Sequence, residues 1–296
     1  MNENLLNYGH WISKGLSRLA AVWGTAGRDP QAVFLVYEIP FVVDTMKYIL
    51  GDEFASRVLF YNPRVLYWAD AVLTVGPTYF SIVDNISPEA AAVIRRLFLP
   101  PRSASTSSIS QGLPDASSSS TLRLPLVLVL NRAEAQTKGR SWTNFNDALR
   151  VIHQVFGATH IIRPYVCGEY TFHGQLSDFA DAKLVIGIDG ACFGNVLWMQ
   201  APGAIVTIVP AKTNYIPIMP VRDCGYTYAW KFADVANLST SVLLLPDADA
   251  HGAVTVPLEP LERLLRSVRQ QMRKSKISTF DEGDGEEEEE VRAILP

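Results

Sequence analysis

The chain has 296 residues, of which 48% are hydrophobic and 19% charged, enough for two modest domains with buried cores. Its formal net charge is -4, but residues 281–290 hold eight acidic groups, and the rest carries 26 basic against 22 acidic side chains. This mildly basic body suits a small anionic ligand and lacks the dense Lys/Arg face of a nucleic-acid-binding protein, so we expect no nucleic-acid partner.

The three cysteines, Cys167, Cys192 and Cys224, are too few and too far apart for a disulfide framework, although one bridge is open to them. No apolar run reaches the ~18 residues of a membrane span. The N-terminus also lacks the basic start and apolar stretch of a signal peptide. Taken literally, the chain is expected to be soluble and untargeted; that it is a truncated gene product is the open alternative.

Helical and extended patterns alternate through residues 1–100, which we interpret as an N-terminal α/β half. The first helix is predicted over residues 12–23, where Ile12, Leu16 and Leu19 share one face. The other expected elements are a strand at 32–37, a helix at 41–50, strands at 57–61 and 70–75, and a helix from Ser87 to Leu99.

A serine-dominated stretch at 101–123 cannot bury enough apolar surface to order itself, so it predicts a disordered linker and a domain boundary. Beyond it, a C-terminal half spans 124–277. Its expected elements are strands at 124–130, 160–165, 183–188 and 204–209, helices at 143–156 and 175–182, and a loop entering a helix at 190–200. Such alternation predicts a parallel, doubly wound sheet of the Rossmann type, which binds ligands beyond the carboxyl ends of its strands.

The end of the chain combines a basic helix with an acidic tail. Residues 259–276 form a helix with six Lys/Arg side chains, and residues 278–296 form a tail predicted to be disordered and solvated. A tail that folds back to shield a basic cleft is the alternative interpretation.

The strongest local feature is KLVIGIDGACFGN at 183–195, a hydrophobic strand followed by a glycine-containing turn and a helix start. Gly187, Gly190 and Gly194 would let the backbone approach a ligand, and the N–H groups of the helix start favour phosphate. The same glycines would also permit tight packing of the strand against the helix. Asp189, in this turn, is either a turn carboxylate or a hydrogen-bonding partner of the ligand.

Three other residues are candidates for chemistry. Arg132 follows the strand 124–130 and could grip phosphate oxygens, or be an ordinary loop arginine. His10 lies at a loop–helix junction, where a histidine serves either as a general base or as a structural residue. Cys192 lacks the motif context of a nucleophile, so a small packed thiol is expected there.

Three blocks of the sequence, in order over two thirds of the chain, resemble glycosyltransferase family 61. NYGHWI at 7–12 is similar to the family's opening block, and LVLVLNR at 126–132 to its strand-plus-arginine block. The stretch 174–210 resembles its most recognisable region. The matching positions in that stretch are Gln175, Gly190, Ala191, Asn195, Pro202 and Gly203.

This resemblance implies an inverting transferase with two Rossmann-like halves (GT-B type) and usually no bound metal or other cofactor. The nucleotide-sugar would lie on the C-terminal half and the glycan or glycoprotein acceptor on the N-terminal half. Family members include plant xylosyl- and arabinosyltransferases and an EGF-domain O-GlcNAc transferase, which implies the Golgi or ER lumen. The donor-binding residues implied are Arg132, Gln175, Gly190, Ala191, Gly194 and Asn195, and the catalytic ones are His10, as the base, and Asp189.

One departure from the family pattern is that His-Gly-Ala appears here as Asp189-Gly190-Ala191, an anion in place of a neutral or cationic group. A catalytically inactive GT-B scaffold protein is therefore the alternative function. A dinucleotide-dependent enzyme is a weaker alternative, because no ribose-binding acid follows the strand 204–209.

Overall fold

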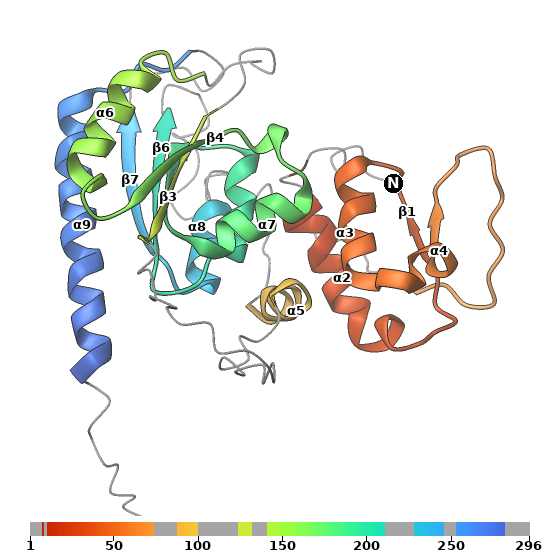
Figure 1. Ribbon diagram of the computed structural model, residues 1–296. Coiled ribbons are helices and arrows are strands. Elements are labelled where there is room, and N and C mark those ends of the chain that lie inside the picture. Colours follow the sequence, from red (N-terminus) through yellow and green to blue (C-terminus); the bar gives the residue numbers. More distant parts are fainter. Residues whose placement is uncertain are drawn as a thin grey trace, which may run out of the picture.

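The structure is a computed structural model that describes residue 8 and residues 11–73, 88–99, 124–131, 141–210, 228–245 and 253–281 (Figure 1). Its centre is a sheet of five parallel strands in the order β4-β3-β5-β6-β7. The strands are β3 (Leu126–Leu130), β4 (Ile161–Tyr165), β5 (Ala182–Ile188), β6 (Ala204–Pro210) and β7 (Ser239–Leu245). The predicted parallel α/β sheet is thus confirmed.

The strand order places the reversal point of the sheet between β3 and β5. The chain leaves β3 for β4 on one side, then crosses to β5 on the other side and continues outward to β6 and β7. Loops that leave adjacent carboxyl ends in opposite directions open a crevice at such a point, and ligands of doubly wound sheets bind there.

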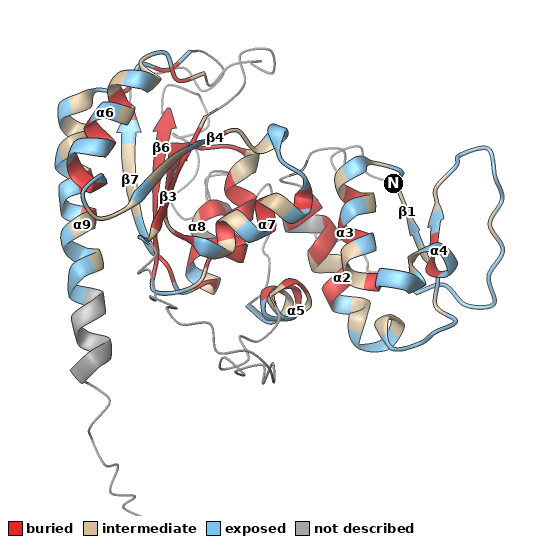
Figure 2. Ribbon diagram, viewed as in Figure 1, coloured by how far each residue is buried: buried red, intermediate tan, exposed pale blue. Residues whose placement is uncertain are grey.

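Both faces of the central strands are buried because nearly all of their residues are apolar. The polar exceptions are Lys183 in β5 and Thr207 in β6. Along β3, Leu126, Leu128 and Leu130 point into one hydrophobic cluster, while Val127 and Val129 point into the other. The edge strands β4 and β7 are less buried and consist mainly of exposed and intermediate residues, as Figure 2 shows for β7.

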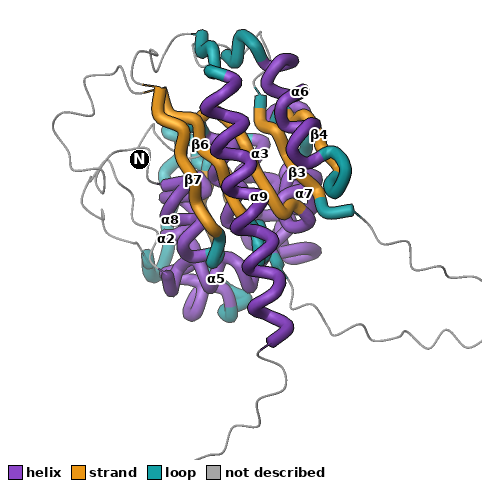
Figure 3. Tube along the Cα trace, turned by 90° about the vertical axis from the view of Figure 1, so that its left-hand side faces the viewer, coloured by secondary structure: helices purple, strands orange, loops and turns teal. Residues whose placement is uncertain are grey.

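Helices cover the two faces of the sheet in separate groups. The helices α6 (Phe145–Phe156) and α9 (Leu258–Asp281) pack on the Val127 face, and Figure 3 shows α9 running across the strands. The opposite face carries α7 (Phe172–Asp181), the 3-10 helix η7 (Ala191–Trp198) and α8 (Tyr228–Val235). Within the described residues, no helix is long and apolar enough to cross a membrane.

The N-terminal half contains a short parallel pair of strands, β1 (Phe34–Val36) and β2 (Val58–Phe60). Between them run α3 (Pro40–Leu50), η4 (Gly51–Glu53) and α4 (Phe54–Arg57), so β1 to β2 form one β-α-β unit. Gly51 ends α3 with a φ of 54°, a conformation that glycine adopts without strain. The flanking elements are η2 (Trp11–Gly15), α2 (Leu16–Val22), η3 (Trp23–Gly27) and α5 (Pro88–Phe98).

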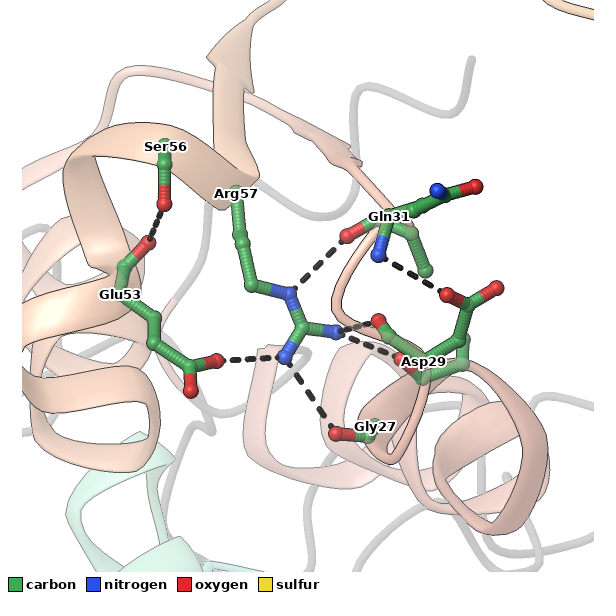
Figure 4. A network of polar contacts seen from close by, with 8 residues as sticks. Gly27, Asp29, Gln31, Glu53, Ser56 and Arg57 are labelled. Atoms are coloured by element: carbon green, nitrogen blue, oxygen red, sulfur yellow. Dashed lines mark hydrogen bonds and ion pairs between the residues drawn. The ribbon is translucent and has the colours of Figure 1, made fainter.

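Arg57 fixes the start of this unit (Figure 4). Its side chain is buried, and its guanidinium forms an ion pair of 2.7 Å with Glu53. It also donates hydrogen bonds to the backbone carbonyls of Ala26, Gly27, Asp29 and Ala32. A buried guanidinium requires such partners, and here they tie the loop before β1 to α4.

The N-terminal helices pack directly on the α7–η7 side of the sheet, within one continuous hydrophobic cluster. The ring of Phe98 in α5 lies 4.9 Å from that of Trp198 in η7 and 5.5 Å from that of Phe172 in α7. Arg95 of α5 donates hydrogen bonds to the carbonyls of Leu197 and Met199, which end η7. The two halves are therefore joined through α5, α7 and η7.

Several sequence-based boundaries differ from the structure. The first helix is α only over α2 and continues on both sides as π-helical turns, where Trp11 packs its ring against Gly15. Residues 70–73 form no strand, and 74–75 lie outside the described residues. The helix α9 continues to Asp281, so the tail predicted from 278 begins as helix; the rest of the tail and the linker 101–123 lie outside the description.

Candidate functional site

A cavity of about 480 Å³ lies at the reversal point of the sheet, which is the size of a small-molecule site. Residues that follow three adjacent strands line it: Asn131 after β3, Val166 after β4, and Ile188 with Gly190 at the end of β5. The sequence-based expectation of a ligand site beyond the carboxyl ends of these strands therefore coincides with a cavity.

The N-terminal half supplies the opposite wall of the cavity. This wall consists of Tyr8 together with Pro40, Phe41 and Asp44 from the start of α3. The rings of Tyr8 and Phe41 meet edge to face with their centroids 5.5 Å apart. The cavity thus lies between the two halves.

Three helices begin at the cavity. Pro40 opens α3, Phe172 opens α7, and Gly190 with Ala191 opens η7. The first N–H groups of a helix have no partner within that helix, and its dipole adds partial positive charge at this end. At α7 one such group, the N–H of Gly174, donates to the Thr171 hydroxyl oxygen. The start of α3 adds little, because Pro40 has no N–H and the N–H groups of Val42 and Val43 donate to the Ile39 carbonyl. The starts of α7 and η7 favour an anionic ligand.

A disulfide between Cys167 and Cys192 joins two walls of the cavity. Cys167 lies in the loop after β4 and Cys192 at the start of η7, with Cα atoms 6.0 Å apart. The expectation of a packed thiol at Cys192 is therefore wrong. The bridge holds the start of the loop after β4 against the helix that begins beside Gly190.

A buried polar network lies behind the cavity and connects both halves. The Tyr8 hydroxyl donates to Asn195 Oδ1 over 2.5 Å, and the Trp198 indole donates to the same oxygen over 3.1 Å. Asn195 Nδ2 donates to Gln175 Oε1 over 2.8 Å. Gln175 Nε2 in turn donates to the carbonyls of Cys167 and Tyr170. Burial raises the pKa of Tyr8 well above its usual range, so its hydroxyl stays a donor.

The structure brings some of the sequence-predicted donor residues to the cavity and not others. Gln175, Gly190 and Ala191 line it. Asn195 is fully buried with its amide occupied by the network, and Gly194 packs against Ile12 of η2 instead of facing the cavity. Whether any of them binds a donor stays a prediction.

Asp189 lies between two cavity-lining residues but is itself only 3% exposed. Its backbone N–H donates to the carbonyl of Ile208 in β6 over 3.0 Å, so this residue continues the sheet toward β6. His10 and Arg132 lie outside the described residues; Asn131, which directly precedes Arg132, lines the cavity.

Trp142, Tyr170 and Asp44 are among the cavity residues that sequence reasoning missed. Trp142 is 5% exposed, and within the described residues its indole N–H has no acceptor. Tyr170 is 36% exposed and stacks on buried Tyr165 with centroids 4.2 Å apart, which gives the cavity a flat aromatic wall. Asp44 is exposed on α3. An aromatic residue soon after the predicted strand 160–165 could have indicated Tyr170, whereas nothing in the local pattern distinguishes Trp142 or Asp44.

The comparison with protein families identifies the family of the chain. The family model described as Glycosyltransferase 61 matches residues 8–206. The chain belongs to glycosyltransferase family 61. The resemblance of the three sequence blocks is thereby confirmed, and the matched span includes every described residue that lines the cavity of this family 61 protein. The comparison with curated proteins gives no match.

Proposed function

We propose that this family 61 protein is an inverting glycosyltransferase that moves a sugar from a nucleotide-sugar to a hydroxyl of a glycan or protein. A UDP-linked pentose or N-acetylglucosamine is the proposed donor, by the family resemblance. The observation that carries the proposal is the cavity at the reversal point of the sheet, bounded by the starts of α7 and η7 and by both halves.

The donor diphosphate is proposed to lie against the start of η7, where Gly190 and Ala191 line the cavity. Arg132, one residue beyond Asn131, would add a bidentate contact to the phosphate oxygens. Tyr170 offers its face to the nucleobase, and Trp142 Nε1 needs an acceptor that a donor oxygen would supply. Gln175 and Asn195 would support this wall through their network, with only Gln175 reaching the cavity.

In the proposed reaction, a base removes the proton of the acceptor hydroxyl while its oxygen attacks the anomeric carbon from the face opposite the diphosphate. The bond from that carbon to the diphosphate oxygen breaks, and the nucleoside diphosphate leaves. Fixed N–H groups that receive the leaving negative charge supply the larger catalytic term in such a site.

A second candidate function is a GT-B scaffold that binds ligands without turnover. Asp189 favours it, because a buried carboxylate beside Gly190 repels a diphosphate. Replacing Asp189 by histidine separates the two candidates. In a degenerate relative Asp189→His should tighten UDP binding by about tenfold, which is ~1.4 kcal/mol. In an active enzyme adapted to Asp189 the same change should weaken binding or abolish transfer.

A secretory location is proposed on the same basis. The disulfide between Cys167 and Cys192 supports it, since such bonds persist in oxidising compartments. The expectation that transfer needs no metal stays a prediction, which adding EDTA to the assay tests.

A ligand panel tests the proposed function. Thermal shifts of the wild-type protein are measured with UDP, GDP, CMP, their sugars and NAD, followed by release of free nucleotide from each bound sugar donor. Stabilisation by a nucleotide-sugar with release of its nucleotide is expected. Binding without release would favour the scaffold, and stabilisation by NAD alone would favour a dinucleotide-dependent enzyme.

A further inference from the structure

We propose that Asp44 is the catalytic base of the transfer, the role for which the sequence alone points to His10. The inference rests on the proposed function and assigns one step of it to a residue of the N-terminal half. Among the described residues that line the cavity, Asp44 is the only one with a charged side chain.

The packing of α3 sets the position of Asp44. Phe41, Asp44 and Tyr48 lie on one face of the helix, at spacings of three and four residues. Tyr48 stacks on Phe98 of α5, and its ring meets that of Phe172 in α7 edge to face. Its hydroxyl donates to the Phe98 carbonyl over 3.1 Å. This face of α3 is thereby fixed against α7, and Asp44, one turn before Tyr48, reaches the cavity.

The charge of Asp44 restricts what it can face. A carboxylate repels a diphosphate, so the two occupy different parts of the cavity. The starts of η7 and α7 favour the anion on the side of the sheet, whereas Asp44 lies on the N-terminal wall. Asp44 is also exposed, which leaves it accessible to an acceptor that approaches from solvent. Lys47, one turn further along α3, is directed elsewhere and lies over the Phe54 ring.

In the transfer, the acceptor O–H proton passes to a carboxylate oxygen of Asp44 as the acceptor oxygen bonds to the anomeric carbon. The carbon–oxygen bond to the diphosphate breaks, and its electron pair leaves with the nucleoside diphosphate. With water as acceptor the same step yields free sugar and UDP, so donor hydrolysis reports on the base even while the natural acceptor is unidentified. A positioned general base contributes a rate factor of roughly 10² to 10⁴.

The test compares wild type with Asp44→Asn, Asp44→Glu and a control, Asp52→Asn, which removes an exposed carboxylate that does not line the cavity. UDP affinity is measured by calorimetry, and turnover as UDP released from UDP-xylose and UDP-N-acetylglucosamine. We expect Asp44→Asn to lower kcat by about 100-fold or more while the Kd for UDP stays within about threefold. Asp44→Glu should recover part of kcat, and Asp52→Asn should match wild type.

Three results would overturn the assignment of Asp44 as the base but leave the proposed function intact. They are turnover by Asp44→Asn within about threefold of wild type, UDP binding tightened about tenfold by that variant, and loss of turnover in His10→Gln but not in Asp44→Asn. Tightened binding would mean that Asp44 faces the phosphates. A wild-type protein that binds no UDP would remove the proposed function and this assignment with it. One that binds UDP but releases none from either donor would favour the scaffold and also overturn the assignment.

Discussion

Replacing Asn195 distinguishes a structural amide from a ligand-binding one. Asn195→Leu leaves the Tyr8 hydroxyl, the Trp198 indole and Gln175 Oε1 without their partner in a buried environment. Each orphaned group costs about 1–3 kcal/mol. We therefore expect a loss of about 4 kcal/mol in the free energy of unfolding, a large part of the ~5–15 kcal/mol that stabilises a typical domain.

Tyr8→Phe is the milder variant of the same network. It removes one donor but leaves Asn195 Oδ1 with the Trp198 indole, so the expected cost is about 1 kcal/mol. The double variant should lose about 1 kcal/mol less than the sum of the single losses, because the Tyr8 hydroxyl is then no longer orphaned. Urea unfolding followed by tryptophan fluorescence gives these values, and calorimetry gives the UDP affinity of each folded variant.

One result would refute this reasoning. If Asn195→Leu costs less than about 1 kcal/mol but weakens UDP binding more than about tenfold, the amide contacts the donor and the network is incidental. Additive losses in the double variant would likewise show that Tyr8 and Asn195 do not depend on each other.

Three further predictions concern the space around two glycines, the disulfide and the pH dependence of stability. Gly187→Ala should cost about 2 kcal/mol in urea unfolding, because its Cβ would lie 2.7 Å from that of Leu130. The matched Gly194→Ala, whose Cβ would have ordinary contacts of 3.5 Å, should change stability by less than about 0.5 kcal/mol, and equal losses would contradict the packing. Replacing both disulfide cysteines by serine opens a link across 25 residues and should cost about 3 kcal/mol; an unchanged melting temperature in reducing agent would argue against the bridge. Because burial raises the pKa of Tyr8 in the folded protein, the unfolded state loses this proton first, above about pH 10. The free energy of unfolding should therefore be constant below that pH and fall above it, and it should fall less steeply with pH in Tyr8→Phe. Equal slopes in the wild type and Tyr8→Phe would exclude Tyr8 as a cause.

The sheet was predictable because its central strands are almost continuous apolar runs. Leu126–Leu130 and Ala204–Pro210 are buried throughout, and alternation with helices requires parallel pairing. The position of the cavity followed from the parallel sheet, because ligands of such sheets bind beyond the carboxyl ends of the strands. The strand β7 was missed because it is an edge strand that begins with exposed Ser239 and Thr240, and such a strand shows no buried pattern.

The roles of the polar residues could not be predicted in the same way. A buried amide such as that of Gln175 needs hydrogen-bond partners, which can belong to a ligand or to the protein. Its sequence context is therefore the same for a ligand-binding role and for a structural role. In the sequence, Asp44 has the pattern of an ordinary exposed residue of an amphipathic helix. Its place at the cavity depends on the packing of α3 on α7, which the sequence does not indicate. The pairing of Cys167 with Cys192 likewise depends on two loops that meet at one sheet edge.

The central claim is that the cavity beyond the carboxyl ends of β3 and β5 binds a nucleotide-sugar, and blocking it tests this most directly. Ala191→Trp places a large ring in the cavity. The control Ala158→Trp adds the same ring in the exposed turn before β4, at the amino ends of the strands and therefore away from the cavity. The measurement is the Kd for UDP by calorimetry, with circular dichroism to verify the fold. We predict equal affinity for wild type and Ala158→Trp and a loss of more than about tenfold for Ala191→Trp. Equal affinity in all three folded proteins would place the nucleotide elsewhere and contradict the account.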